Sequence, residues 1–254
     1  MQNQNKRIVI VGATSAIAEH CARNWVIEPG ADLTLVVRNR SKAETIATDL
    51  RVRGPSASVR IVETDFANAA AIRRLADSLA AVGPLDIVLI AHGTLPDQAE
   101  CEQDLEMASE AMHINGISPV LFAEAFAGKM AGVNRGTLGI IGSVAGDRGR
   151  KSNYIYGAAK SLVTRYAQGL QHRMALAKHS GVKVVLIKPG PTATPMTAHL
   201  TTQTVKMARV EDVAKCIVNG MATGRPVVYA PRKWVVIMMV IRHLPRFVFN
   251  RMDI

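Results

Sequence analysis

Tyr156 and Lys160 stand four residues apart in the segment SNYIYGAAKSLV, a spacing that places both side chains on one face of a helix. A phenol with an ordinary pKa of about 10 is a poor acid at neutral pH, and a nearby ammonium group favours its ionised form. The pair therefore predicts a tyrosine that exchanges a proton with a substrate oxygen. Tyr154 precedes Lys160 by about 600° of helical rotation, so it is expected to face away from the lysine. Ser143 follows the apolar run GTLGII, at the strand end where open α/β sheets bind ligands.

A glycine turn follows the first apolar run of the chain and leads into a helix that continues to Trp25. Gly12 permits a tight turn and a close approach of the backbone, and the N–H groups at the start of the helix suit a pyrophosphate. Ala16 and Ala18 stand where dinucleotide-binding folds often have glycine, and alanine is still small enough for a close approach. The turn therefore predicts a dinucleotide site with contacts from Gly12, Thr14, Ser15, Ala16 and Ile17.

Two arginines, Arg38 and Arg40, follow the second apolar run. At this place an acidic residue would bind the ribose 2′-hydroxyl of NAD, whereas a basic residue would pair with the 2′-phosphate of NADP. We therefore predict NADP(H) in preference to NAD(H), with solvated surface charges as the alternative interpretation of the arginines. Asp65, after the third run, is expected either to meet the adenine amino group or to cap a helix that begins near Ala67.

Strand-like and helical segments alternate along the chain. Helical stretches such as SKAETIATDLRVR separate the apolar runs, and Ser41 with Glu44 predicts a capping box at the start of this one. The alternation indicates a parallel sheet with helices on both faces, and neither a repeat nor a linker divides residues 1–254 into domains. The predicted strands are 7–11, 32–37, 58–62, 85–91, 136–141, 182–187 and 226–230.

The order of these motifs resembles that of the short-chain dehydrogenase/reductase family over nearly the whole chain. The resemblance implies an α/β fold with a Rossmann-type doubly wound parallel sheet of about seven strands in a single domain. It also implies that Tyr156 protonates a carbonyl oxygen, that Ser143 hydrogen-bonds this oxygen, and that Lys160 binds the nicotinamide ribose while lowering the pKa of Tyr156. The matching residues, in order, are the turn from Gly12 to Ala18, Ala91-His92-Gly93, Asn115, Ser143, and Tyr156 with Lys160.

Further site residues follow from the same resemblance. Asn115 is expected to hold a water molecule in a proton relay. His92 stands where the family usually has alanine, and it is expected either to be a satisfied loop histidine or to add a polar contact to the cofactor. Besides the turn, the predicted cofactor contacts are Arg38, Asp65, Ala91, His92, Gly93, Tyr156, Lys160 and the nicotinamide-side residues Pro189, Gly190 and Thr194.

The charge balance of the chain favours anionic partners, because 31 lysines and arginines against 20 acidic residues give a formal charge of +11. Only 4% of the residues are aromatic and no nucleic-acid-binding motif occurs, so we expect no nucleic acid partner. The three cysteines lack the spacing of a metal site and predict neither zinc nor disulfides. The chain opens without a signal-peptide pattern, which predicts a cytoplasmic protein.

Residues 232–254 form a basic and apolar C-terminal extension. Its uninterrupted apolar run, 234–241, is too short to span a bilayer, which takes about 20 residues. We expect the extension either to lie peripherally on the inner face of the plasma membrane or to pack as a core or subunit-interface helix. We also expect a homo-oligomer, a dimer or a tetramer, with apolar helices such as 161–176 as candidates for the contact.

Together these features predict an NADPH-dependent ketone reductase or alcohol dehydrogenase. The segment KPGPTATPMTAHL and the C-terminal extension are similar to those of family reductases that act on decaprenylphosphoryl-2-keto-ribose. This similarity implies a lipid-linked carbonyl substrate, a keto-sugar on a polyprenyl phosphate. Two alternatives are a reductase of soluble small molecules such as 3-oxoacyl thioesters, and a non-catalytic NADP-binding scaffold.

Overall fold

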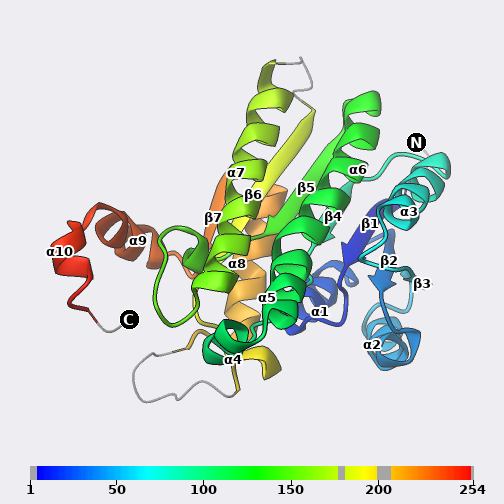
Figure 1. The fold of residues 1–254 in the computed structure, drawn as a ribbon. Coiled ribbons are helices and arrows are strands. Elements are labelled where there is room, and N and C mark those ends of the chain that lie inside the picture. The colour runs from blue at the N-terminus through cyan, green and yellow to red at the C-terminus, as the bar shows by residue number, and fades with distance from the viewer. Residues whose placement is uncertain (1–4, 177–180, 199–206, 253–254) are drawn as a thin grey trace.

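One sheet of seven parallel strands forms the centre of the fold (Figure 1). The computed structural model describes residues 5–176, 181–198 and 207–252; the ends of KPGPTATPMTAHL (199 and 200) and of the extension (253 and 254) lie outside these ranges. The seven predicted strands are all confirmed. They are β1 (Lys6–Val11), β2 (Ala31–Val37), β3 (Ser58–Glu63), β4 (Ile87–Ile90), β5 (Gly136–Ile141), β6 (Val182–Pro189) and β7 (Val227–Ala230).

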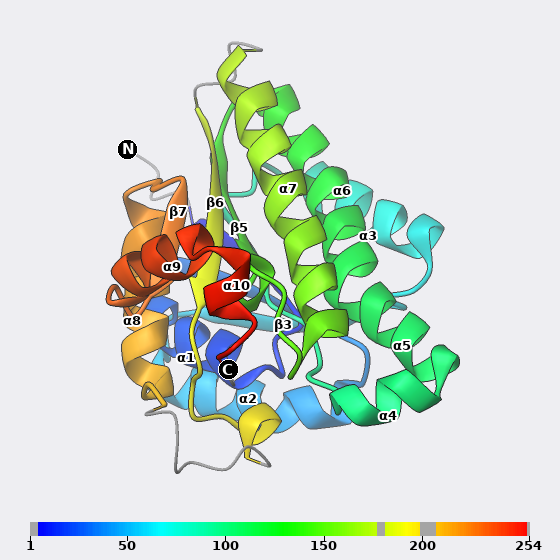
Figure 2. The same cartoon turned by 60° about the vertical axis from the view of Figure 1, so that its left-hand side comes forward.

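Helices cover both faces of the sheet, as Figure 2 shows. On one face, apolar side chains of α1 (Ala16–Trp25), α2 (Arg40–Arg53) and α8 (Val210–Ala222) pack with one set of alternating strand residues. On the other face, α3 (Ala69–Ala81), α6 (Ser118–Val133) and α7 (Tyr154–Leu176) pack with the opposite set. The shorter elements are α4 (Gln98–Gln103), α5 (Leu105–Met112), the π-helix η1 (His113–Ile117), and the 3-10 turns η2 (Val144–Gly146) and η3 (Pro195–Thr197).

The strand order β3-β2-β1-β4-β5-β6-β7 confirms the doubly wound arrangement. From β1 the chain first builds outward to β3 and then returns to the other side of β1 through β4. At such a reversal the loops after neighbouring strands diverge, and they leave a crevice at the carboxyl ends of the strands. The predicted site residues follow these carboxyl ends.

Two helix starts differ from the sequence prediction. Helix α2 begins at Arg40, and its cap is Asn39, whose side-chain oxygen accepts from the N–H groups of Ser41 and Lys42. The predicted capping box of Ser41 with Glu44 is therefore wrong, because Asn39 supplies the cap two residues earlier.

The start of α3 also differs. This helix begins at Ala69 and is capped by Asn68, whose side chain accepts from Ala71 N–H, so the alternative prediction that Asp65 caps it is wrong. Asp65 Oδ1 instead accepts from Ala67 N–H at 2.8 Å and closes a turn before the helix.

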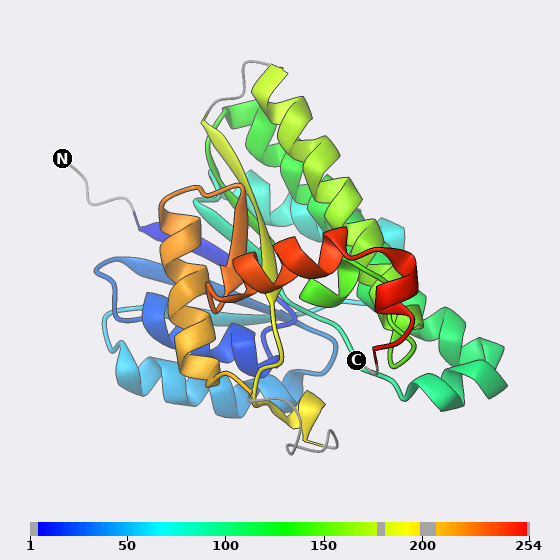
Figure 3. The same cartoon turned by 90° about the vertical axis from the view of Figure 1, so that its left-hand side faces the viewer.

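The C-terminal extension folds into two helices, α9 (Trp234–His243) and α10 (Arg246–Phe249), which lie beside the loop that precedes α7 (Figures 1 and 3). Trp234 packs so closely on Gly190 that a Cβ at this glycine would lie 1.9 Å from the indole nitrogen. Within α9 only Met238 is buried. Among the described residues, no helix combines the length and apolar character needed to cross a membrane.

Candidate active site

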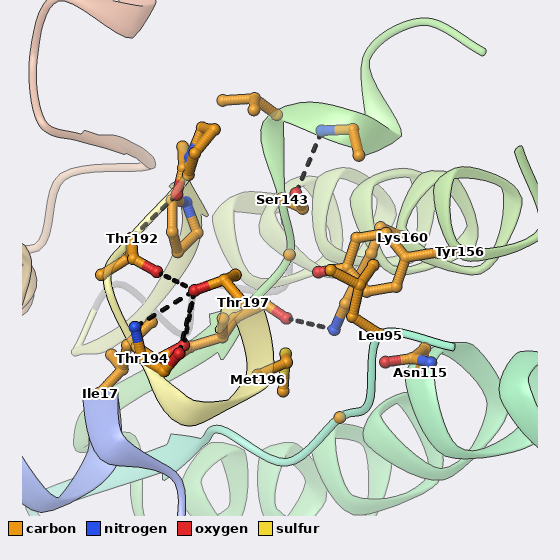
Figure 4. Close-up of a pocket in the computed structure, with 18 of the residues that line it drawn as sticks. Ile17, Leu95, Asn115, Ser143, Tyr156, Lys160, Thr192, Thr194, Met196 and Thr197 are labelled. Atoms are coloured by element: carbon orange, nitrogen blue, oxygen red, sulfur yellow. Dashed lines mark hydrogen bonds between the residues drawn. The ribbon is translucent and has the colours of Figure 1, made fainter. Parts of the chain in front are cut away.

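Helix α7 and the loop after β5 bring Ser143, Tyr156 and Lys160 to the wall of one pocket (Figure 4). Ser143 Oγ accepts from Ala145 N–H at 3.1 Å, which leaves the hydroxyl proton for another acceptor. Tyr154 is 43% exposed and does not line the pocket, so its predicted orientation away from Lys160 is confirmed. The helical spacing and the parallel sheet thus assemble three polar groups at the carboxyl end of β5.

Lys160 is the most deeply buried of these groups, with only 2% of its surface exposed. Its Nζ donates to the carbonyl oxygen of Ile141 at 3.2 Å and lies 5.7 Å from the ring centroid of Tyr156. Burial penalises the charged form and lowers the pKa of Lys160 to about 8. The protein therefore holds an ammonium group in the pocket at an energetic cost.

Tyr156 experiences opposing influences. Burial raises the pKa of its phenol, while interaction with the Ser143 hydroxyl and the charge of Arg150 lower it. The sequence predicted that Lys160 lowers the pKa of Tyr156, but burial is the largest influence in the free protein and acts in the opposite direction. Tyr156 consequently keeps its proton near neutral pH, as a proton donor must.

Asn115 lies in the π-helical turn η1, and the structure uses its side chain to fasten the loop after β4. Its Oδ1 accepts from Thr94 N–H at 2.9 Å, and its Nδ2 donates to Ala111 O at 2.9 Å. A Cβ on Gly93 would lie 2.7 Å from Oδ1, so only glycine fits beneath this amide. Asn115 positions the pocket wall, and its contact with a relay water stays a prediction.

A second pocket adjoins the first at the glycine turn before α1. Gly12 adopts φ +77°, and a Cβ there would lie 2.6–2.8 Å from atoms of His92, so the turn and the close approach both require glycine. The start of α1 presents its free N–H groups to this space, a surface that fits a pyrophosphate. The predicted contacts Gly12, Thr14, Ser15, Ala16, Ile17, Arg38, His92, Gly93 and Thr194 all line the pocket.

Two basic side chains line this second pocket. Arg38 and Lys42 line it together with Asn39. Arg40 does not line it, because its guanidinium binds Glu44 at 3.0 Å and reaches the carbonyl of Ile61. Of the two arginines predicted near a 2′-phosphate, Arg38 therefore lines the pocket. Lys42, four residues after Arg38, lines it as well and was not predicted from the sequence.

His92 is buried between the two pockets, with one ring nitrogen bonded and the other unpartnered. Because Ser118 Oγ donates to Phe66 O at 2.7 Å, it accepts from His92 Nε2, which lies 2.9 Å away. Nδ1 is then an unprotonated acceptor, and it has no partner in the described part of the chain. Burial lowers the pKa of His92 to about 3, so the ring stays neutral. A free acceptor here fits a ribose hydroxyl of the cofactor.

The segment after β6 forms the opposite wall of the pocket. Thr197 Oγ1 donates to Thr192 O at 2.6 Å and accepts from Thr194 N–H, which gives the segment a fixed turn. Pro189, Gly190 and Thr194, predicted on the nicotinamide side, line the pocket together with Ala91, His92 and Gly93. Asp65 lies apart from both pockets, beside Arg38 at the outer edge.

The loop between η2 and α7, residues 147–153, carries two pocket residues that the sequence analysis missed, Arg150 and Asn153. Asp147 holds its start by a buried ion pair with Lys188, and it accepts from the Tyr229 hydroxyl at 2.8 Å. Arg148 donates to two carbonyl oxygens of the extension, of Ile241 at 2.5 Å and of Leu244 at 2.7 Å. No pattern in the sequence signals these partners, because each lies more than 40 residues away along the chain.

Comparisons with known proteins agree with this geometry. A family model described as short chain dehydrogenase matches residues 6–205. An uncharacterized oxidoreductase of Mycobacterium tuberculosis is 34% identical over 247 residues, which cover 96% of this chain and 96% of the relative. A short chain dehydrogenase from Burkholderia cenocepacia, solved in complex with NADP, has a TM-score of 0.79 at 19% identity and covers 99% of this chain and 98% of its own. One from Sphingobium yanoikuyae, in complex with NADPH, has a TM-score of 0.77 at 21% identity, with 94% and 96% covered.

The burial of Lys160 generates a prediction about stability. Its pKa lies near 8 in the folded chain and near 10.5 when unfolded, so at pH 7 the charge opposes folding and Lys160→Met should raise the free energy of unfolding by about 1–3 kcal/mol. Between pH 8 and 10.5 only the unfolded chain keeps the proton, so wild type gains stability and the difference shrinks. Urea denaturation across this pH range, with exposed Lys42→Met as the control, measures the effect. A Lys160→Met chain that is less stable at pH 7 would contradict the prediction.

Proposed function

The chain belongs to the short-chain dehydrogenase family, and we propose that it is an NADP(H)-dependent oxidoreductase that reduces a ketone to an alcohol. One observation carries the proposal: Ser143, Tyr156 and Lys160 line a pocket that adjoins a second pocket at the glycine turn. A protein that only bound the cofactor would not need a phenol and a buried ammonium on one wall, which argues against the scaffold alternative.

The reaction requires one wall to hold the carbonyl oxygen and give it a proton. NADPH, when bound, supplies the hydride that reduces the carbonyl carbon. Ser143 donates to the carbonyl oxygen and Tyr156 transfers its phenolic proton to that oxygen as negative charge develops there. The positive charges of Arg150 and Lys160 favour the phenolate left behind. The raised pKa of Tyr156 keeps the donor loaded before each turnover.

The chain's own residues suit the phosphates and the riboses of the cofactor. The N–H groups at the start of α1 bind the pyrophosphate, and Arg38 with Lys42 pairs with a 2′-phosphate. His92 Nδ1 accepts from a ribose hydroxyl, and Lys160 donates to the nicotinamide ribose. Glu19 is the single acid among the described residues that line the second pocket, and its carboxylate is already paired with Arg23, so it does not favour the ribose 2′-hydroxyl of NAD. The relatives solved with NADP and NADPH support the same preference.

The C-terminal extension supports a lipid-linked ketone, such as a keto-sugar on a polyprenyl phosphate. The extension exposes apolar side chains and cations next to the loop 147–153, a combination that suits an anionic membrane surface. A reductase of soluble 3-oxoacyl thioesters has no need of the apolar part. The exposed groups are Val235, Val236, Met239, Val240 and Phe247, with Arg232, Lys233, Arg242, Arg246 and Arg251.

Tyr156→Phe tests the proposed function. Removing the hydroxyl deletes the proton donor and leaves the ring packing, so kcat for ketone reduction should fall about 10²–10⁴-fold with little change in the Kd of NADPH. Stopped-flow oxidation of NADPH and fluorescence titration measure the two quantities, and Tyr154→Phe is the matched control with normal turnover. Near-normal turnover of Tyr156→Phe would refute the assignment.

Arg38→Gln tests the cofactor preference. Loss of a charge-assisted hydrogen bond to the 2′-phosphate should weaken NADP⁺ binding about tenfold or more and leave NAD⁺ binding nearly unchanged. Arg40→Gln is the matched control, because its guanidinium is already bound by Glu44. Calorimetric titration of both cofactors against both variants decides the question. Equal losses for the two cofactors, or equal effects of the two variants, would count against a 2′-phosphate site.

Phe247→Ser combined with Met239→Ser tests the membrane contact without removing Trp234, which packs on Gly190. Wild type should sediment with phosphatidylglycerol-containing vesicles and not with pure phosphatidylcholine, and the double variant should lose most of this binding. Val52→Ser, which removes an equally exposed apolar side chain on α2, is the control. Unchanged sedimentation of the double variant would remove the membrane argument and favour a soluble substrate.

A further inference from the structure

Arg150 brings a second cation to the wall of the pocket that holds Tyr156. Among the described residues that line this pocket, Arg150 and Lys160 are cations and none is an aspartate or glutamate. Burial lowers the pKa of Arg150 and only Tyr156 acts in the opposite direction, yet a guanidinium keeps its charge at any physiological pH. Within the described ranges no carboxylate or carbonyl pairs with this guanidinium. A partly buried and unpaired cation is costly, so the pocket is complementary to an anion that enters with the ligand.

The backbone that carries Arg150 is anchored on its N-terminal side. Asp147 is tied to Lys188 on β6 and Tyr229 on β7. Arg148 is tied to the extension, where its guanidinium also lies 3.8 Å from the ring centroid of Phe249. Fixing the loop in advance lowers the entropic cost of binding an anion. These anchors distinguish Arg150 from a flexible surface arginine.

Asn153 adds an unsatisfied polar group to the same part of the pocket. Its Oδ1 is buried and has no partner among the described residues, although its backbone N–H donates to Arg150 O at 3.2 Å. A buried acceptor without a donor is rare in folded proteins, and Asn153 is one of the residues that line the pocket. A hydroxyl group on the ligand would satisfy it. The pocket thus offers a cation, a hydrogen-bond acceptor and the Ser143 and Tyr156 pair.

We propose that the substrate is a hydroxylated ketone that carries a phosphate or carboxylate group, with the anion held by Arg150 and a hydroxyl by Asn153. This assignment rests on the proposed function, because it takes the carbonyl to lie at Tyr156. It adds the requirement that substrate charge, and not only shape, determines selection. Arg150 is then the specificity residue of the reaction, and the loop 147–153 is its support.

The test compares ketones with and without an anionic group, using the protein saturated with NADP⁺. By isothermal titration, wild type should bind dihydroxyacetone phosphate at least about tenfold more tightly than dihydroxyacetone, and 4-oxopentanoate more tightly than 4-oxopentanamide. The larger of these two ratios distinguishes a phosphate from a carboxylate. Arg150→Gln should bring both ratios to within about twofold of unity. Arg165→Gln, which removes an exposed charge on α7, should retain the wild-type ratios.

A second pair of ligands tests the proposed contact between Asn153 and a hydroxyl group of the substrate. Wild type should prefer dihydroxyacetone phosphate over acetol phosphate, which lacks one hydroxyl, and Asn153→Leu should bind the two equally. Two results would overturn the proposal. One is a charged-to-neutral affinity ratio near unity in wild type, and the other is an equal fall of this ratio in Arg150→Gln and Arg165→Gln. Equal loss of turnover with charged and neutral ketones in Arg150→Gln would assign Arg150 to the pKa of Tyr156 instead. Binding needs no turnover, so a charge-dependent affinity in a protein that never oxidises NADPH would refute the reductase function and leave the anion site standing.

Discussion

The common direction of all seven strands is the constraint on which the rest of the molecule depends. Because every strand points the same way, the loops after β1, β4, β5 and β6 meet at one edge of the sheet. The glycine turn, the His92 loop, Ser143 and the Pro189 segment come from these four loops and wall one continuous cleft. Reversing one strand would place its loop at the far edge and remove one wall.

Two lysines are equally buried but differ in whether a carboxylate neutralises their charge. Lys188 and Lys160 are both nearly inaccessible to solvent. Lys188 is neutralised by Asp147, so its charge fixes the position of a loop. Lys160 donates to the carbonyl oxygen of Ile141 and has no carboxylate partner among the described residues, and burial lowers its pKa to about 8. An uncompensated charge destabilises the fold, yet it is available to a ligand, which is why such groups concentrate at active sites.

The sequence was sufficient for features set by local periodicity. It predicted the seven strands, the helix that carries Tyr156 and the rotation that excludes Tyr154, because continuous apolar runs and the 3.6-residue helical period are both local features of the chain. It misplaced the caps of α2 and α3, because each helix is preceded by more than one side chain that can cap it, Asn39 or Ser41 for α2 and Asp65 or Asn68 for α3. It missed Arg150 and Asn153, since their place at the pocket depends on anchors far along the chain. The single domain, the oligomer and the water at Asn115 stay predictions.

Arg148 and Trp234 join the C-terminal extension to both sides of the substrate pocket, one through the loop 147–153 and the other through Gly190. Coupling between ligand binding in the pocket and docking of the extension is reciprocal, because it is a single free energy shared by the two equilibria. A ligand that strengthens the contacts between the loop and α9 is in turn bound more tightly, by the same factor, when α9 and α10 are held in their docked position. The contacts of Arg148 and Trp234 thus connect the position of the extension with the shape of the pocket.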